Sequence, residues 1–440
     1  MKKLIILLCV LLSAPLFAQQ ELLQSGPMLG YSEMLEVPIW LQTKSACKVK
    51  VVYWVKDNPK HSFSTDAVST NKNDAFTAKL YADKVEPGKT YEYAVFINDK
   101  KLQFNYPTQF KTQPIWRWRA DPPDFTIVAG SGTYINESQF DRPGKPYGSD
   151  YHIFESIFKK SPDLMIWLGD NTYLREPDWN SRTGIFHRNS HTRSLKELQP
   201  LLASTHHYAI WDDHDFGPND SDGSFWNKET TLEAFKLFWP NPSFGFKELH
   251  GAISFFNYGD ADFFLLDNRY YREPNKKSGS NKTMLGKEQL NWLKNALASS
   301  ISTFKIVVMG GQFLNSVAAF ETYSNYGFKE ERDEIIDFIY RENIKNVIFL
   351  TGDVHYTVLD KLEIEGKPAI YELTFSPFTS GVNINAEKTN DTNRIPGTLV
   401  MEHNFGWMKF EGKANDRRLI VRSYNADGNQ LFEYSIKASK

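Results

Sequence analysis

The sequence predicts an all-β domain of immunoglobulin or fibronectin type followed by an α/β domain. Lys48–Val55 (KVKVVYWV) is rich in valine and aromatic residues and partly alternates, which is typical of a strand. In Val85–Ile97 (VEPGKTYEYAVFI), a Pro-Gly turn precedes another alternating strand. Short strands separated by turns favour a β-sandwich. From Asp124 onward, apolar strands instead alternate with helical segments, which is the pattern of an α/β domain.

The composition is that of a folded globular protein. At roughly 150 residues per domain, two or three domains are expected in the 440 residues. The chain has 51 Lys+Arg and 53 Asp+Glu, a net charge of -2. This balance excludes a polybasic nucleic-acid binder and an acidic disordered chain. Two cysteines are too few for a disulfide scaffold.

Residues 1–18 have the pattern of a secretory signal peptide. Lys2 and Lys3 precede an apolar run from Leu4 to about Leu12, and cleavage is expected near Ala18. The run is shorter than the about 20 residues that cross a bilayer. We therefore predict an exported protein without a membrane anchor, located in the periplasm or outside the cell.

The changes of pattern along the chain predict the domain boundaries. Residues 20–114 are expected to form the β-sandwich domain, residues 115–123 a linker, and residues 124–440 the second domain. Helices are predicted near Asp150–Lys160, Gly286–Ser299 and Lys329–Arg341. The tail returns to β from Gly406, with Asp427–Gly428 as a hairpin turn.

Five apolar strands end in small or polar residues. They are Phe125–Gly132 (FTIVAGSG), Asp163–Asp170 (DLMIWLGD), Tyr208–Asp215 (YAIWDDHD), Lys305–Gln312 (KIVVMGGQ) and Asn346–His355 (NVIFLTGDVH). In α/β sheets, binding sites form beyond the carboxyl ends of the strands. If the strands are neighbours in one sheet, six polar side chains meet there: Asp170, Asp213, His214, Gln312, Asp353 and His355.

Carboxylates at this density share a pocket only when cations neutralise them. Oxygen ligands with one or two imidazoles suit Mg²⁺, Ca²⁺, Mn²⁺ or iron better than a closed zinc site. Two ions about 4 Å apart hold a hydroxide and clamp a phosphoryl oxygen. Asp170 follows a glycine at the end of an apolar strand and is the natural bridging ligand. His214 is the candidate proton donor to a leaving group.

Each of these residues also has a structural interpretation. A Gly-Asp pair such as Gly169–Asp170 is often only a turn, and isolated histidines such as His206 and His207 are more often structural. Asp212 either caps a helix or holds an arginine. Two further acids either bind Ca²⁺ or are solvated turn residues: Asp215 and Asp220. The functional interpretation is favoured because GD, DDHD and GDVH all occur at apolar strand ends.

The chain resembles the alkaline phosphatase D family of metallophosphoesterases in five motifs. They are WLGDNTYLRE (Trp167–Glu176), AIWDDHDFGPNDSD (Ala209–Asp222), FLLDNRYYR (Phe264–Arg272), VVMGGQ (Val307–Gln312) and LTGDVH (Leu350–His355). The β-rich N-terminal segment also looks like the domain that precedes the catalytic domain in this family. The resemblance implies a calcineurin-like four-layer αββα sandwich with metal ions at its strand ends, and hydrolysis of phosphate monoesters or diesters outside the cytoplasm.

The resemblance also implies roles for individual residues. Asp170 is the expected bridging ligand, and His214 corresponds to the catalytic histidine of the superfamily's GNH motif. The other implied metal ligands are Asp213 at the Asn of GNH, Gln312 at a ligand histidine, and Asp353 and His355 at the two histidines of GHxH.

Two features depart from the family pattern. The first strand of the family commonly ends in a Ser-Cys pair whose cysteine binds iron, whereas Gly132 offers no side-chain ligand here. Ser131, Thr133, Glu137 or water is then the expected replacement, and an oxygen donor favours a harder ion. Well-known members carry a twin-arginine export signal, whereas this chain has Lys2 and Lys3.

Two functional hypotheses follow. The first is a secreted phosphoesterase that uses two or more divalent or trivalent metal ions. In it, Arg175 or Arg269 either binds a phosphoryl oxygen or forms a structural ion pair. Its expected partner is a small-molecule or polymeric phosphate ester, and no nucleic acid, membrane or protein partner is predicted. The second hypothesis, motivated by Gly132, is a catalytically weakened relative that binds phosphorylated ligands or glycans.

Overall fold

Two units make up the chain, which the computed structural model describes over residues 21–247 and 249–439. The first unit comprises the described residues up to Ile115 together with Arg193–His207 and Leu237–Pro240. The second comprises Trp116–Thr192, Tyr208–Lys236 and the described residues from Asn241 onward. The predicted signal peptide lies outside the described residues.

The first unit is built mainly from antiparallel strands. One group has the order β1-β2-β6, with β1 (Leu23–Leu29), β2 (Val37–Thr43) and β6 (Thr77–Ala82). The other has the order β4-β3-β7-β8, with β5 beside β3 and β9 beside β7. Its bounds are β3 (Lys48–Val55), β4 (Ser62–Ser64), β5 (Val68–Ser69), β7 (Thr90–Ile97), β8 (Lys100–Lys101) and β9 (Gln109–Lys111).

Alternation along β3 explains how this unit forms its core. Val49, Val51 and Tyr53 are fully buried and share one hydrophobic cluster with Ile39 and Leu41 of β2. Successive side chains of a strand point to opposite faces, so every second residue faces the core. The predicted strand KVKVVYWV coincides with β3.

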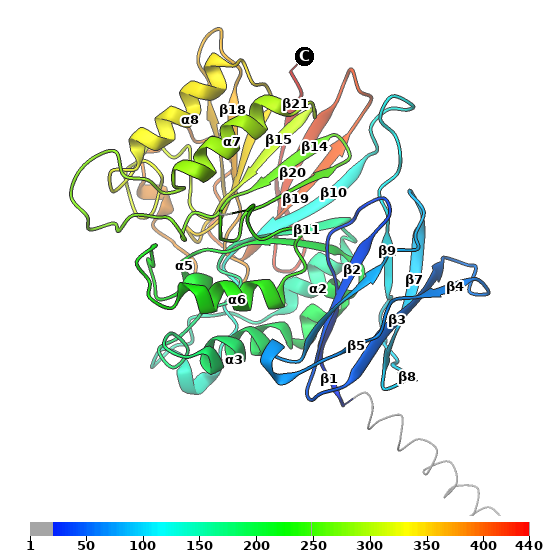
Figure 1. Ribbon diagram of the computed structural model, residues 1–440. Coiled ribbons are helices and arrows are strands. Elements are labelled where there is room, and N and C mark those ends of the chain that lie inside the picture. The colour runs from blue at the N-terminus through cyan, green and yellow to red at the C-terminus, as the bar shows by residue number, and fades with distance from the viewer. Residues whose placement is uncertain (1–20, 248, 440) are drawn as a thin grey trace, which may run out of the picture. The chain divides into compact units, whose positions relative to one another are not determined.

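The second unit contains two sheets (Figure 1). One has the order β21-β20-β19-β10-β11-β12. Of β12, only the residues from Tyr208 onward belong to this unit. Its bounds are β10 (Phe125–Gly130), β11 (Leu164–Leu168), β12 (His206–Ile210), β19 (Asn404–Glu411), β20 (Arg418–Asn425) and β21 (Gln430–Lys437). The other has the order β13-β14-β15-β16-β18-β17. Its bounds are β13 (Ser254–Tyr258), β14 (Ala261–Leu265), β15 (Phe304–Val308), β16 (Val347–Thr351), β17 (Val358–Leu362) and β18 (Ile370–Thr374).

Aromatic and aliphatic side chains pack these sheets against each other and against helices. Phe410 of β19 stacks on Phe125 of β10, with ring centroids 4.5 Å apart, and meets Phe304 of β15 edge-on at 5.2 Å. Helices α7 (Lys287–Ser299) and α8 (Lys329–Arg341) cover the sheet that contains β15, and their buried faces, including Leu293 and Ile339, share one core with it. The sequence predicted both helices within a residue of their observed bounds.

The described residues contain five further α-helices. They are α2 (His152–Lys159), α3 (Arg182–Arg193), α4 (Gln199–Ser204), α5 (Asp213–Phe216) and α6 (Lys228–Phe238). Helix α2 is the one predicted near Asp150–Lys160, and β20 and β21 flank the predicted Asp427–Gly428 turn. Of the helices within residues 21–247 and 249–439, none combines the length and the apolar character that a membrane span requires.

The five polar-ended strands do not lie in one sheet, which corrects the condition set by the sequence. Strands β10, β11 and β12 belong to one sheet of the second unit, whereas β15 and β16 belong to the other. Residues that follow β11, β12 and β16 nevertheless line a common cavity. The two sheets pack face to face, so strand ends from different sheets meet without being hydrogen-bonded neighbours.

Candidate active site

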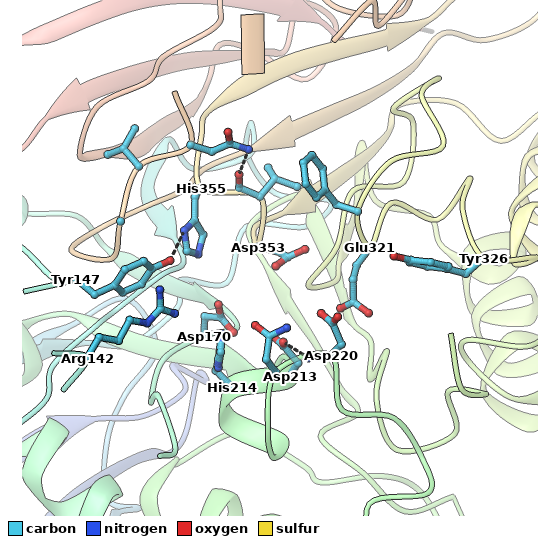
Figure 2. Close-up of a pocket in the computed structure, with 16 residues that line it drawn as sticks. Arg142, Tyr147, Asp170, Asp213, His214, Asp220, Glu321, Tyr326, Asp353 and His355 are labelled. Carbon is cyan, nitrogen blue, oxygen red and sulfur yellow. Dashed lines mark hydrogen bonds between the residues drawn. The ribbon is translucent and has the colours of Figure 1, made fainter. Parts of the chain in front are cut away.

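A cavity of about 460 Å³ lies where these strand ends meet (Figure 2). Five of the six side chains predicted to converge line it: Asp170, Asp213, His214, Asp353 and His355. All five come from the second unit. The structure therefore brings these five side chains together, although the condition of a single sheet does not hold.

The backbone at the strand ends is bent into an uncommon conformation. Asp170, Asp353 and His355 have φ angles of 51°, 65° and 61°, in the left-handed region that non-glycine residues rarely adopt. Such residues cost free energy and cluster at functional sites. Gly169 lies so close to the neighbouring strand end that a Cβ would sit 2.6 Å from Asp212 Cβ. The turn after β11 therefore depends on glycine, and it delivers Asp170 to the cavity.

Asp213 is the common member of three groups of potential metal ligands. Its carboxylate and one donor atom from each partner lie within 4.8 Å of one another in each group. The groups are Asp170, Asp213 and His214; Asp212, Asp213 and Asp353; and Asp213, Asp220 and Glu321. The first group consists of residues that the sequence predicted to converge, whereas Glu321 of the third group lies in a loop that carries no strand-end signal.

Burial and mutual repulsion dominate the electrostatics of these acids. Burial, with the adjacent carboxylates, raises the pKa of Asp170 and of Asp353 well above the usual range. Burial also acts to raise the pKa of Asp213, but His214 and Arg269 outweigh it, so that pKa is lowered. Within the described residues, Asp170 Oδ1 and Asp212 Oδ2 are buried and accept no hydrogen bond. Unsatisfied carboxylate oxygens in an acidic cluster fit the binding of hard cations.

Tyr173 is a site residue that the sequence analysis did not single out. Its hydroxyl donates to Asp170 Oδ2 at 2.9 Å and lies 3.3 Å from His355 Nε2. Its ring stacks on His214 with centroids 4.2 Å apart. The residue was visible three positions after Asp170 in the motif WLGDNTYLRE, but a tyrosine there has no strand-end signal. Its phenol adds an oxygen donor to the cluster and fixes the orientation of His214.

His355 is held by hydroxyl groups on both ring nitrogens. Tyr147 OH lies 3.0 Å from Nδ1, and Ser380 Oγ lies 3.4 Å from Nε2. Burial lowers the pKa of His355 to about 4. The imidazole is therefore neutral near pH 7, which is the form that binds metal ions.

A side chain at position 132 would be crowded by its neighbours. Its φ is +72°, and a Cβ would lie 2.6 Å from Ser380 Oγ and 3.0 Å from Pro377 Cβ. The Ser380 hydroxyl thus occupies the space beside His355 toward which a side chain at position 132 would extend.

The replacements predicted for the missing cysteine lie elsewhere. Ser131 Oγ accepts a hydrogen bond from Asp353 N at 3.1 Å, and Glu137 pairs with His187 at 2.8 Å. Thr133 is buried, and its hydroxyl has no hydrogen-bond partner among the described residues. None of the three lines the cavity.

Gln312 is the predicted metal ligand that the structure does not bring to the cluster. Its Nε2 donates to Thr374 Oγ1 at 3.1 Å, and its Oε1 accepts from Asn315 Nδ2 at 2.8 Å and Tyr356 OH at 2.9 Å. The side chain is fully buried and does not line the cavity. A buried amide must satisfy its polar atoms, and this network does so without a metal ion.

The two arginines predicted near a phosphoryl group also lie outside the cavity lining. Arg269 is fully buried, and its guanidinium pairs with Asp212 and Glu321. Arg175 donates from Nε to Phe140 O at 3.4 Å. Of the two roles left open by the sequence, Arg269 therefore has that of a structural ion pair behind the carboxylate cluster.

The neighbouring acids divide between structural and cavity positions. Asp212 both caps α5 and pairs with Arg269, so its two structural interpretations hold together. Asp215 accepts a hydrogen bond from Asn171 N at 3.1 Å. Asp220 lines the cavity, and its backbone N–H donates to Asp213 Oδ2 at 2.7 Å.

The two histidines interpreted as structural are buried among backbone partners. His206 Nδ1 lies 2.9 Å from Gly30 O, and His207 Nε2 lies 3.2 Å from Leu201 O. Neither lines the cavity.

Comparison with known proteins identifies the family of the chain. The model of the PhoD-like phosphatase family matches residues 138–416. The chain belongs to the PhoD-like phosphatase family. Residues 20–115 match a separate domain of unknown function, DUF7800.

Individual relatives extend the comparison. The chain is 25% identical over 376 residues to alkaline phosphatase D of Bacillus subtilis (strain 168), a match that covers 73% of this chain and 61% of that protein. The match thus spans about three fifths of the curated relative. A solved structure of PhoD superposes with a TM-score of 0.74 at 18% identity, covering 94% of this chain and 92% of that one. Purple acid phosphatase PPD1 from yellow lupin (Lupinus luteus) seeds superposes with a TM-score of 0.65 at 12% identity, covering 93% and 74%. Both structures share the mixed α/β fold.

Proposed function

We propose that this protein is a secreted metal-dependent phosphoesterase that hydrolyses phosphate monoesters or diesters. The observation that carries the proposal is the set of three overlapping ligand groups around Asp213, at strand ends that meet in one cavity. Membership of the PhoD-like phosphatase family supports the same reaction. The substrate class is a small-molecule or polymeric phosphate ester.

The donor chemistry supports two or more metal positions. Asp170, Tyr173 and His355 offer a carboxylate, a phenol and a neutral imidazole to one ion. Asp213, with Asp220, Glu321 and Asp353, offers carboxylates to further ions. Oxygen donors favour Ca²⁺, Mg²⁺, Mn²⁺ or iron. When bound, such ions supply Lewis acidity and lower the pKa of water.

His214 is proposed as the group that protonates the leaving alcohol. It lies in the cavity beside Asp213, and burial lowers its pKa. The Asp213 carboxylate acts in the opposite direction and stabilises the protonated imidazole, which is the form that gives a proton to the leaving alkoxide. Stacking of Tyr173 on the ring orients it for this transfer.

Finer features of the architecture and location belong to the same proposal. We propose that the two packed sheets and their helices form a calcineurin-like αββα sandwich over residues 124–440. A linker at residues 115–123 and an immunoglobulin- or fibronectin-like domain at residues 20–114 precede it. The predicted signal peptide at residues 1–18 supports export to the periplasm or beyond the cell.

Hydrolysis assays of the purified protein test the reaction. Nitrophenyl phosphate and bis-nitrophenyl phosphate would be supplied with Ca²⁺, Mg²⁺, Mn²⁺, Zn²⁺ or iron. We expect metal-dependent turnover that falls about 100-fold or more in Asp170→Asn, because a ligand that orders the cluster is lost. The same exchange at the exposed Asp99 is the control. Unchanged turnover in Asp170→Asn would reject the proposal, and absence of turnover with every metal would favour the binding protein suggested by Gly132.

A further inference from the structure

Arg142 brings a positive charge to the lining of the cavity. It is the arginine that lines the cavity, which otherwise exposes mainly acids, histidines and aromatic rings. Its guanidinium carbon lies 4.0 Å from the centroid of the Tyr147 ring. Within residues 21–247 and 249–439, no carboxylate forms an ion pair with it. Arg175 and Arg269, by contrast, each have an acidic neighbour.

The loop around Arg142 is anchored while the guanidinium stays accessible. Asp141 Oδ1 accepts from Arg142 N at 2.7 Å and from Tyr134 OH at 2.5 Å. Tyr134 and Tyr147 meet edge-on with centroids 4.9 Å apart, and Tyr147 OH lies 3.0 Å from His355 Nδ1. The Tyr147 ring, on which the guanidinium lies, is therefore held in place by two neighbours. Tyr134 contacts it on one side, and His355 of the site contacts its hydroxyl on the other.

The position of Arg142 suits an anion in the cavity. Figure 2 shows it beside Tyr147, on the side of the cavity where Asp170 and His214 lie. A guanidinium offers parallel N–H donors that match two oxygens of one phosphoryl group.

We propose that Arg142, held on Tyr147, forms the anion subsite that binds the non-bridging phosphoryl oxygens of the substrate. The proposal rests on the proposed function and names the group that positions the phosphoryl at the same cavity. It also takes over the role that the sequence left open for Arg175 and Arg269. Inorganic phosphate carries the same oxygens, so the subsite binds it as well.

Phosphate affinity and metal content together test this subsite. Arg142→Gln should raise the KM for nitrophenyl phosphate and the Ki for inorganic phosphate about 10- to 100-fold, the range for a lost hydrogen bond to a charged group. Arg142→Lys should recover part of the loss, because it keeps the charge without the planar donors. Metal content, measured by mass spectrometry, should stay at the wild-type level in both variants. An unchanged Ki in Arg142→Gln would overturn the proposal.

Two further variants distinguish the contact between Arg142 and the Tyr147 ring from a nonspecific effect of removing an arginine. Tyr147→Leu removes the ring and should raise the Ki about 3- to 10-fold through the lost cation–π contact. The matched control is Arg182→Gln, because Arg182 also lies 4.0 Å over a ring, that of Phe186, but pairs with Glu233 at 2.7 Å outside the cavity. An equal effect in the control would overturn the proposal. Calorimetric titration with inorganic phosphate measures the subsite even if the protein hydrolyses no ester, so failure of the proposed function is distinguishable.

Discussion

Position 132 combines a left-handed backbone with a crowded surrounding. Gly132 has a φ of +72°, and a Cβ would lie 2.6 Å from Ser380 Oγ. The left-handed conformation costs a residue with a side chain about 1–2 kcal/mol. We therefore expect Gly132→Cys alone to lower the melting temperature by a few degrees. Differential scanning calorimetry of the metal-free protein measures this shift, and an unchanged melting temperature would contradict it.

The crowding also decides how a thiolate is tested at this position. Ser380→Ala removes the hydroxyl that a side chain at position 132 would contact. The double variant Gly132→Cys/Ser380→Ala should therefore melt at a higher temperature than Gly132→Cys alone. The double variant should bind iron more tightly than Ser380→Ala alone, since a soft anionic donor is added beside His355. If the double variant is as unstable as Gly132→Cys, contact with Ser380 is not the cause of the strain.

Helix α5 shows how one element holds the carboxylate cluster in place. Arg269 is fully buried between the helix cap Asp212 and Glu321. Removing one member of a buried ion pair leaves uncompensated charge and typically costs about 3–5 kcal/mol. We expect Arg269→Gln to destabilise the metal-free protein strongly and to recover stability when metal is added, because cations then neutralise the same acids. Melting temperatures with and without metal measure both effects.

A second buried arginine provides the matched control. Arg417 is also fully buried and pairs with Asp260 at 2.7 Å, but neither residue lines the cavity. Arg417→Gln should destabilise the protein without a comparable recovery on addition of metal. Equal recovery in both variants would contradict a specific role of Arg269 at the cluster.

Strand ends could be predicted because their signal is local. An apolar run followed by Gly-Asp, as at Asp170 and Asp353, marks a buried strand that stops at a polar edge, and both residues line the cavity. Helices α7 and α8 were equally predictable, because a repeating apolar face is written in consecutive residues. The local patterns alone did not assign these strands to two sheets, since pairing depends on contacts between distant segments; only the resemblance, with its αββα sandwich, implied two sheets.

The site residues that the sequence did not predict correctly are those whose roles depend on contacts between distant segments of the chain. Glu321 joins the cluster from a long loop, and its ion pair with Arg269 spans residues far apart in the chain. Gln312 follows a strand like the true cavity residues, but its amide finds partners in Thr374 and Tyr356 instead. The local pattern at Gln312 is the same in either case, so only the packing of the surrounding side chains decides its role.

The net charge of the whole molecule does not reveal that the cavity is strongly acidic. The net charge of -2 over 440 residues is close to neutral. Five acids nevertheless face one cavity: Asp170, Asp213, Asp220, Glu321 and Asp353. Composition excluded whole classes of partner, but it contains no information about such local concentration.

The pH dependence of stability is set partly by a buried histidine that does not line the cavity. His207 is fully buried, and burial lowers its pKa to about 3. In the unfolded chain a histidine has a pKa of about 6.5, so below that pH the unfolded state binds a proton that the folded state excludes. Its contribution to stability is therefore complete above about pH 6.5 and is lost as the pH falls toward 3.

Replacing this histidine should remove the acid sensitivity that it causes. His207→Gln keeps a side-chain donor for Leu201 O but cannot titrate. We compare the free energy of unfolding of the variant with that of the wild type. The difference in favour of the variant should grow as the pH falls from 6 to 4, by up to about 1.4 kcal/mol for each pH unit. Urea unfolding at a series of pH values measures this difference, with the same substitution at the exposed His61 as control. A pH-independent difference between wild type and His207→Gln would mean that the histidine takes up its proton without unfolding.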